Sequence, residues 1–93
     1  MSDPISLLVN AEKAEDLASR TETALQNNHQ EAERLARELV DMMQILHGPM
    51  HMEVGVAQFY LALALEEQGK EPEAIEVRKR ARKILLGQGV WRN

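Results

Sequence analysis

The apolar residues of this chain recur at intervals of three and four in four separate stretches, which is the spacing of one face of an α-helix. Short polar breaks separate the stretches. The pattern predicts four helices, over residues of about 4–26, 28–46, 51–68 and 72–86. The fold class expected is therefore all-α.

Helix-boundary residues stand where this pattern needs them. Asp3-Pro4 has the form of an N-cap followed by proline at the first helical position, and Asn28 with Glu31 resembles a capping box. Gly48-Pro49 cannot continue a helix comfortably. We expect this dipeptide to divide the chain into two helix pairs, 4–46 and 51–86, followed by a tail at 87–93.

The four helices differ in how much apolar surface they offer. The first has a thin stripe, more than half of it Ala or Thr: Leu8, Ala11, Ala14, Leu17, Ala18, Thr21 and Leu25. In the third, Gly55 and Gln58 are the only residues from Val54 to Leu65 that are not apolar. A helix that is apolar on almost every side must be covered on more than one face.

A weak internal repeat relates the two pairs at an offset of 42 residues. Residues 26–32 (QNNHQEA) correspond to residues 68–74 (QGKEPEA). In each copy a residue able to adopt a left-handed conformation, Asn27 or Gly69, precedes a short turn and a new helix. The offset predicts one domain, residues 1–93, built from two similar helical units.

Specific residues of the second pair resemble the tetratricopeptide repeat family, most closely the 42-residue variety found in kinesin light chains. The matching residues are Leu61-Ala62, Leu65, Gly69, Ala74 and Ala81. The resemblance covers about residues 27–86 and implies two antiparallel helix pairs in a right-handed stack. The first helix departs from it, because the family's apolar positions fall on polar residues such as Asp16 and Ser19.

Two interpretations of the first helix remain open. In one, its register is shifted by two residues, so that Leu17-Ala18 takes the place of Leu61-Ala62; we favour this one. In the other, it is a capping helix that only completes the stack.

The resemblance also implies a binding face. Family members line their concave groove with residues that correspond here to Val56, Phe59, Leu63, Glu66 and Glu67, joined from the first helix by Leu17, Thr21 and Leu25. Members that clamp a peptide carboxylate have Lys and Asn at the positions of Phe59 and Leu63. The apolar pair instead favours an amphipathic helix or a second copy of the chain. Alternatively, the first helix covers this face through Ile5, Leu8 and Val9.

The expected function is therefore that of a protein–protein interaction module, a small adaptor or chaperone-like protein. Two repeats are fewer than the three or so usually needed for a stable stack, which favours a homo-oligomer or a protein partner. The chain has no Cys, no phosphate-cradling glycine loop and no activated serine, so we expect no enzyme and no cofactor. His47 and His51 are four residues apart, but the break at Gly48-Pro49 favours cap or loop histidines over metal ligands.

Two alternatives stay open: a four-helix bundle with a purely structural role, and a nucleic-acid-binding protein, which the distribution of charge suggests. The net charge is −4, yet helix 72–86 carries a cluster of basic residues: Arg78, Lys79, Arg80, Arg82 and Lys83. Such a helix could bind nucleic acid, although a solvated outer face explains the cluster better in an acidic chain. No signal peptide or membrane-spanning stretch is evident, so a cytoplasmic protein is expected.

Overall fold

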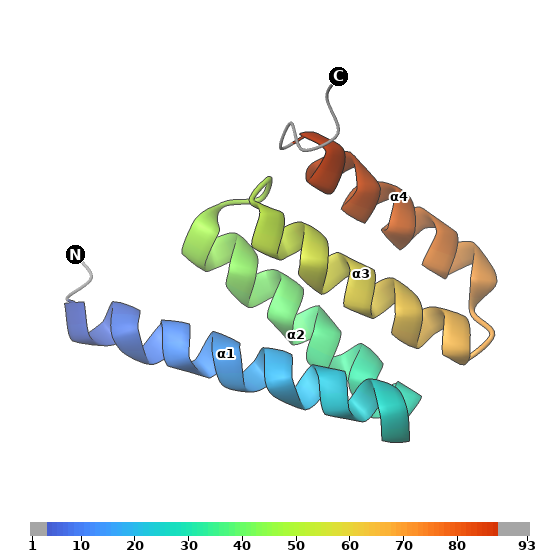
Figure 1. Ribbon diagram of the computed structural model, residues 1–93, viewed down its shortest axis with the longest axis horizontal. Helices are drawn as coiled ribbons and strands as arrows, with labels where there is room; N and C mark the ends of the chain where they lie inside the picture. The colour runs from blue at the N-terminus through green and yellow to red at the C-terminus, as the bar shows by residue number, and fades with distance from the viewer. Residues whose placement is uncertain (1–3, 88–93) are drawn as a thin grey trace.

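The computed structural model describes the backbone of residues 4–87 and the side chains of residues 11–87. Four helices form this part of the chain: α1 (Pro4–Asn27), α2 (His29–His47), α3 (Met52–Glu67) and α4 (Glu71–Gly87). Each helix runs back along the one before it (Figure 1). The all-α class is confirmed, and the packing is compatible with a tetratricopeptide-like stack. The N-cap expected at Asp3 lies outside the described residues, as do residues 88–93 of the tail expected at 87–93. Gly87, the first residue of that tail, is instead the last residue of α4.

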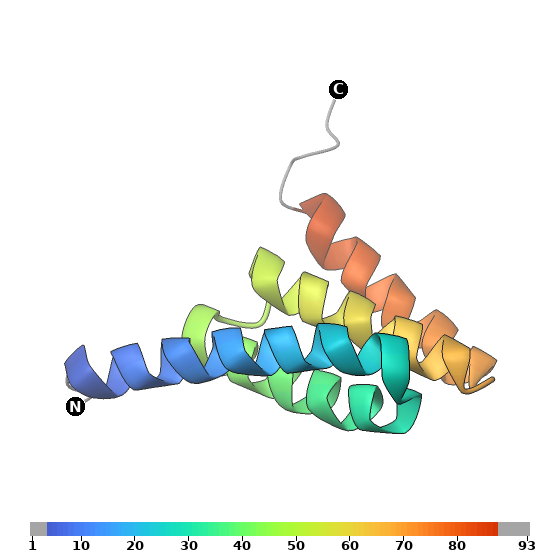
Figure 2. The ribbon, with the colours of Figure 1, turned by 60° about the horizontal axis from the view of Figure 1, so that its bottom comes forward.

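Helix α3 is the centre of the molecule. It packs against each of the other three helices, whereas within the described chain the α4 backbone approaches α3 alone (Figures 1 and 2). The buried residues of α3 lie around most of its circumference: Val54, Gly55, Ala57, Gln58, Leu61, Ala62, Ala64 and Leu65. The expectation that this helix is covered on more than one face is confirmed.

The core forms two connected clusters. The first joins α1, α2 and α3, with Leu17, Leu39 and Val54 among its buried members, and also includes Ile84 of α4. The second joins α2, α3 and α4 around Leu61 and Leu65. Alanines are buried in both clusters because small side chains let helix axes approach closely.

The turns between paired helices differ in length. Asn28 alone separates α1 from α2; its backbone is extended, and its side chain accepts a hydrogen bond of 3.1 Å from the Glu31 amide. Three residues, Gln68, Gly69 and Lys70, separate α3 from α4, and Gly69 has a φ of +78°. The left-handed conformation expected at Gly69 is confirmed. The one expected at Asn27 is wrong, because Asn27 is the last residue of α1 and no described non-glycine residue has a positive φ.

The longer first helix explains the register of α1. Buried positions correspond at an offset of 44 residues in the first helices, as in Leu17 and Leu61. They correspond at 42 in the second helices, as in Ala32 and Ala74. After Leu17, α1 continues for ten residues, whereas α3 continues for six after Leu61. The four extra residues, less the two by which the first turn is shorter, give the two-residue difference. The burial pattern therefore agrees with the register shift favoured from the sequence.

A network of polar side chains ties α2 to the turn between α3 and α4. Glu33 accepts hydrogen bonds from Gln68 (2.8 Å), Lys70 (3.0 Å) and Arg37 (2.9 Å), and Arg37 also reaches Glu73 at 2.6 Å. Burial of Glu33 by itself raises the pKa of its carboxyl group. The three donors outweigh this effect and lower that pKa to about 2.

We predict that Glu33→Gln lowers the free energy of unfolding by ~1–3 kcal/mol at pH 7, since it removes charge-assisted hydrogen bonds. The pKa of Glu33 is about 2 in the folded chain against an ordinary value of 4.5, so this stability is complete above pH 4.5 and is lost as the pH falls towards 2. Urea denaturation at pH 7, 5 and 3 measures the free energy of unfolding. The difference between variant and wild type should be the same at pH 7 and 5 and smaller at pH 3.

Glu38→Gln is the matched control, because Glu38 is on the same helix and pairs with Arg34, but both side chains are half exposed. Its effect should stay below ~1 kcal/mol. If Glu33→Gln lowers the free energy of unfolding by the same amount at pH 7 and at pH 3, the prediction is contradicted.

Candidate protein-binding site

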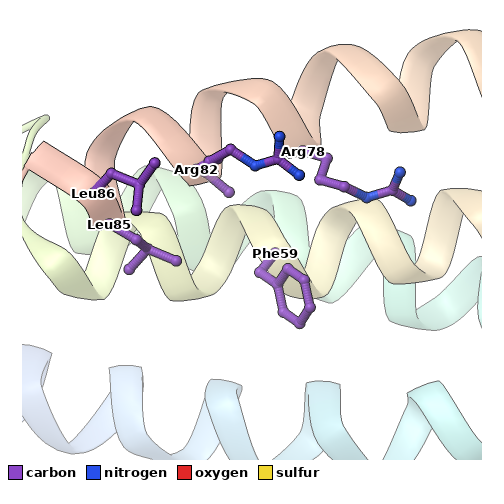
Figure 3. A pocket seen from close by; sticks show the side chains of 6 residues that line it. Phe59, Arg78, Arg82, Leu85 and Leu86 are labelled. Carbon is purple, nitrogen blue, oxygen red and sulfur yellow. The ribbon is translucent and has the colours of Figure 1, made fainter. Parts of the chain in front are cut away.

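A groove with mainly apolar walls lies between α3 and α4 (Figure 3). It encloses about 280 Å³ and is lined by one residue of α3 and five of α4: Phe59, Arg78, Ala81, Arg82, Leu85 and Leu86. Phe59 and Leu86 are each 43% exposed, which leaves much of both side chains in contact with solvent. We call this feature the α3–α4 groove.

The groove exists because α4 has a wider apolar face than α3 alone can cover. The buried stripe of α4 ends at Ala81 and Ile84. Leu85 and Leu86 follow directly in sequence; Leu85 lies at the edge of the stripe and is only half buried, and Leu86 is exposed. Apolar side chains thus line the space beside the α3–α4 contact.

Gly55 sets the position of Leu85. A Cβ atom at Gly55 would lie 2.9 Å from both Cγ and Cδ2 of Leu85 and 3.2 Å from Cγ2 of Ile84. Only a residue without a side chain lets the C-terminal turns of α4 approach α3 this closely. Gly55 therefore holds Leu85 against the α3 backbone as one wall of the groove.

Two arginines border the apolar surface. Arg78 forms an ion pair with Glu66 of α3. Arg82 has no ion-pair partner among the described residues. In Figure 3 both side chains extend from α4 along the space beside Phe59. One guanidinium group at the groove is therefore paired, and the other is available.

The residues of α3 expected to bind a partner are partly brought to this groove. Phe59 lines it, and Glu66 lies at its edge through the ion pair with Arg78. Val56 and Leu63 are half buried and Glu67 is exposed, but they do not line it.

The residues expected from the first helix do not belong to this surface. Leu17 and Thr21 are 6% and 0% exposed, and Leu25 packs half-buried against the first core cluster. The Thr21 hydroxyl donates to the Leu17 carbonyl oxygen at 2.7 Å. The expectation that Leu17 and Thr21 line an open groove is corrected: in the register that the longer α1 adopts, both side chains lie in the core.

An exposed hydrogen bond also joins α1 to α3. The Tyr60 hydroxyl donates to Glu22 Oε1 at 3.0 Å. The alternative in which Ile5, Leu8 and Val9 cover the α3 face concerns side chains outside the described set.

Five groove residues, all on α4, were not expected from the sequence: Arg78, Ala81, Arg82, Leu85 and Leu86. The three-four spacing of Ala74, Val77, Ala81, Ile84 and Leu85 predicts a single buried stripe on this helix, and the arginines were expected on a solvated face. A usable signal was present, because Leu85 and Leu86 extend the apolar surface of α4 beyond a single stripe while no further helix was predicted to cover it.

The two histidines considered as metal ligands have other roles. Their rings stack with centroids 4.5 Å apart, and His51 Nδ1 accepts a hydrogen bond from the Glu53 amide at 3.1 Å, which caps α3. In residues 11–87 no three or more His, Asp or Glu side chains gather in a way that could hold a metal ion. None of the four described helices is both long and apolar enough to cross a bilayer.

A second hollow, over α3 between α2 and α4, is more polar. Its lining includes Val40, Gln58 and Arg80, with Leu61 and Val77 beneath. The Gln58 Oε1 atom is buried and has no hydrogen-bond partner among the described residues.

The fold and the groove define an all-α protein of two stacked helix pairs with an uncovered apolar surface at one end. Comparisons with protein-family models, curated proteins and solved structures found nothing that matches this chain. The function is therefore argued from the geometry of the groove.

We predict that Gly55→Ala lowers the free energy of unfolding by about 1 kcal/mol. The new methyl group displaces Leu85 at an overpacking cost of ~1–3 kcal/mol, against a gain in helix propensity of ~1 kcal/mol. Urea denaturation measures the difference. Gly87→Ala is the control, because nothing lies within 4 Å of its added Cβ. A Gly55→Ala protein at least as stable as wild type would show that Leu85 moves without cost.

Proposed function

We propose that this chain is a protein-interaction module, of the small adaptor or chaperone-like kind, that binds an amphipathic helix of a partner protein in the α3–α4 groove. The observation that carries the proposal is the exposed apolar surface of Phe59, Leu85 and Leu86 between two antiparallel helices. A trough between two helices has the shape that accepts the side-chain ridge of a third. Apolar residues at helical spacing are the usual anchors of such a ligand.

The apolar contacts alone support weak binding. Burying the remaining exposed surface of three large side chains contributes on the order of 3–5 kcal/mol. Association also costs translational and rotational freedom, so these contacts by themselves correspond to a dissociation constant no tighter than about the millimolar to high micromolar range. Polar contacts at the rim of the groove must supply the remaining affinity and the selectivity.

A second copy of the chain fits the groove less well as a continuation of the stack. In that arrangement α1 of the next copy would lie beyond α4 with its outer face towards the groove. At the 44-residue offset, the α1 positions that correspond to Ala57 and Ala64 carry the exposed residues Lys13 and Arg20. Burying two cations beside the unpaired Arg82 would cost several kcal/mol, so a helix from another protein is the occupant we propose.

The basic surface of α4 supports the nucleic-acid alternative less strongly. Arg78 is paired with Glu66 and Lys79 with Glu76, which offsets part of the positive charge. The remaining described cations of α4, Arg80, Arg82 and Lys83, do not share one face of the helix. Apolar groove residues have no use in phosphate contacts, whereas a helical ligand uses them.

We predict that a neutral helical peptide binds the groove. The probe is a stapled, acetylated and amidated 16-residue helix with Val, Ala, Leu and Ala at positions i, i+3, i+7 and i+10 and Gln at i+4. It should shift the amide NMR resonances of Phe59 and Leu86 with a dissociation constant of about 1 mM or somewhat below. The double variant Phe59→Asp/Leu86→Asp should weaken binding at least about tenfold, because it places carboxylates in the apolar trough.

Ile45→Asp is the matched control, since Ile45 is 81% exposed on α2 and lies outside the groove. It should bind the probe as wild type does. Circular dichroism checks that each variant keeps its helical content. A probe at millimolar concentration that leaves the groove resonances unchanged would refute the proposed function.

A further inference from the structure

The face of α4 that lines the groove corresponds to the face of α2 that packs against α3. The α2 residues Ala36, Leu39 and Met43 belong to core clusters that include α3 side chains, and Val40 packs half-buried against the first of them. The 42-residue offset that relates α2 to α4 maps these four positions onto Arg78, Ala81, Arg82 and Leu85. All four of the latter line the α3–α4 groove. The groove therefore lies against α4 where α3 lies against α2.

The two faces differ mainly in charge. At the positions of Ala36 and Val40 the second pair carries Arg78 and Arg82. Arg78 is already matched by Glu66, but Arg82 has no ionic partner in residues 11–87. A helix seated in the groove as α3 is seated on α2 would cover Arg82 and remove water from its guanidinium group. An unpaired buried charge is strongly unfavourable, so the ligand must bring a carboxylate.

The α3 helix shows where that carboxylate belongs. Val40 of α2 and Gln58 of α3 line the same hollow. Arg82 of α4 is the residue equivalent to Val40. A ligand helix placed on α4 as α3 is placed on α2 would therefore bring its equivalent of Gln58 close to Arg82. The buried Gln58 Oε1 lacks a donor there, as expected opposite an apolar side chain. A ligand residue equivalent to Gln58 would instead meet the five N–H donors of an arginine.

From this equivalence, and on the basis of the proposed function, we propose that the α3–α4 groove selects an amphipathic helix with a carboxylate beside its apolar stripe, and that Arg82 binds this carboxylate. The stripe follows the spacing of Val54, Ala57, Leu61 and Ala64, which α3 buries. The acidic residue stands four positions after the first stripe residue, as Gln58 stands after Val54. Arginine and carboxylate pair in a fixed, two-pronged geometry, which gives selectivity as well as affinity. Neutral helices leave Arg82 unmatched, and basic helices are repelled.

The test uses three stapled peptides that differ at position i+4 alone: Glu, Gln or Lys, on the apolar stripe of the neutral probe. Isothermal titration and NMR shifts of Phe59 and Leu86 measure binding to the full chain. The Glu peptide should bind wild type at least about tenfold tighter than the Gln peptide, which corresponds to 1.4 kcal/mol. The Lys peptide should bind more weakly than either, and the advantage of Glu should shrink between 0.05 and 0.5 M NaCl.

Arg82→Gln should reduce the preference for Glu over Gln to less than about twofold while the groove resonances still respond. Arg80→Gln is the matched control, because Arg80 is on the same turn of α4 but lines the other hollow. It should keep the full preference. Arg82→Glu should reverse the order and bind the Lys peptide best, which a loss of fold cannot imitate.

The possible failures are distinguishable. Equal affinities of the Glu and Gln peptides for wild type, with groove resonances shifted by both, overturn the acidic preference and leave the proposed function standing. No shift with any peptide overturns the proposed function itself. The chain also carries an acid-flanked apolar surface of its own, with Glu38, Asp41 and the exposed Ile45 on α2. Concentration-dependent self-association that both Ile45→Asp and Arg82→Gln abolish would make a second copy the occupant and overturn the proposal.

Discussion

The structure depends on covering α3, whose residues from Val54 to Leu65 are apolar on almost every side. A helix of this kind cannot be stable in water unless other helices surround it. The other three described helices cover most of its circumference, and the part that they leave uncovered includes Phe59. The candidate binding site is thus the remainder of the same hydrophobic surface that holds the fold together.

Close helix contacts make this arrangement possible in a chain of 93 residues. Ala32 and Ala74 have no exposed surface, and Gly55 lets the end of α4 lie against α3. Small residues bring the helix axes together, so that few large side chains are needed to fill the space between them. Next to these alanines, Glu33 and Arg37 join α2 to the turn before α4 and to α4 itself. Apolar packing and charged hydrogen bonds therefore act together at this end of the stack, and Gly55 allows close packing at the other.

The repeat explains how a binding surface can arise beside a filled core. The same helical face occurs twice, on α2 and on α4, and in the first copy it is covered by α3. In the second copy an apolar floor at Ala81 and Leu85 persists, while Arg78 and Arg82 stand where the first copy is apolar. A charge at this position is hydrated while the groove is empty and needs an ionic partner once water is removed, which is the basis of the proposed selectivity.

The sequence by itself determined the helices, because their signals are local. Every expected helix boundary lies within one residue of the observed one, since apolar periodicity, the cap at Asn28 and the glycine at 69 act within a turn or two of the chain. The need to cover α3 on several faces was also evident from its composition. The sequence did not determine which side chains would form the site. Leu17 and Thr21 were expected at a surface but lie in the core, and Leu85 was expected in the core but lines a groove.

Only the tertiary structure decided those positions, for a geometrical reason. Helix α1 continues four residues further beyond Leu17 than α3 does beyond Leu61, and its turn is two residues shorter, so the register of α1 shifts by two positions and its apolar stripe meets α2. The exposure of Leu85 and Leu86 likewise depends on α4 having α3 as its only close backbone neighbour in the described chain. Periodicity shows which residues share a face of a helix, but the packing of the whole chain determines what that face meets.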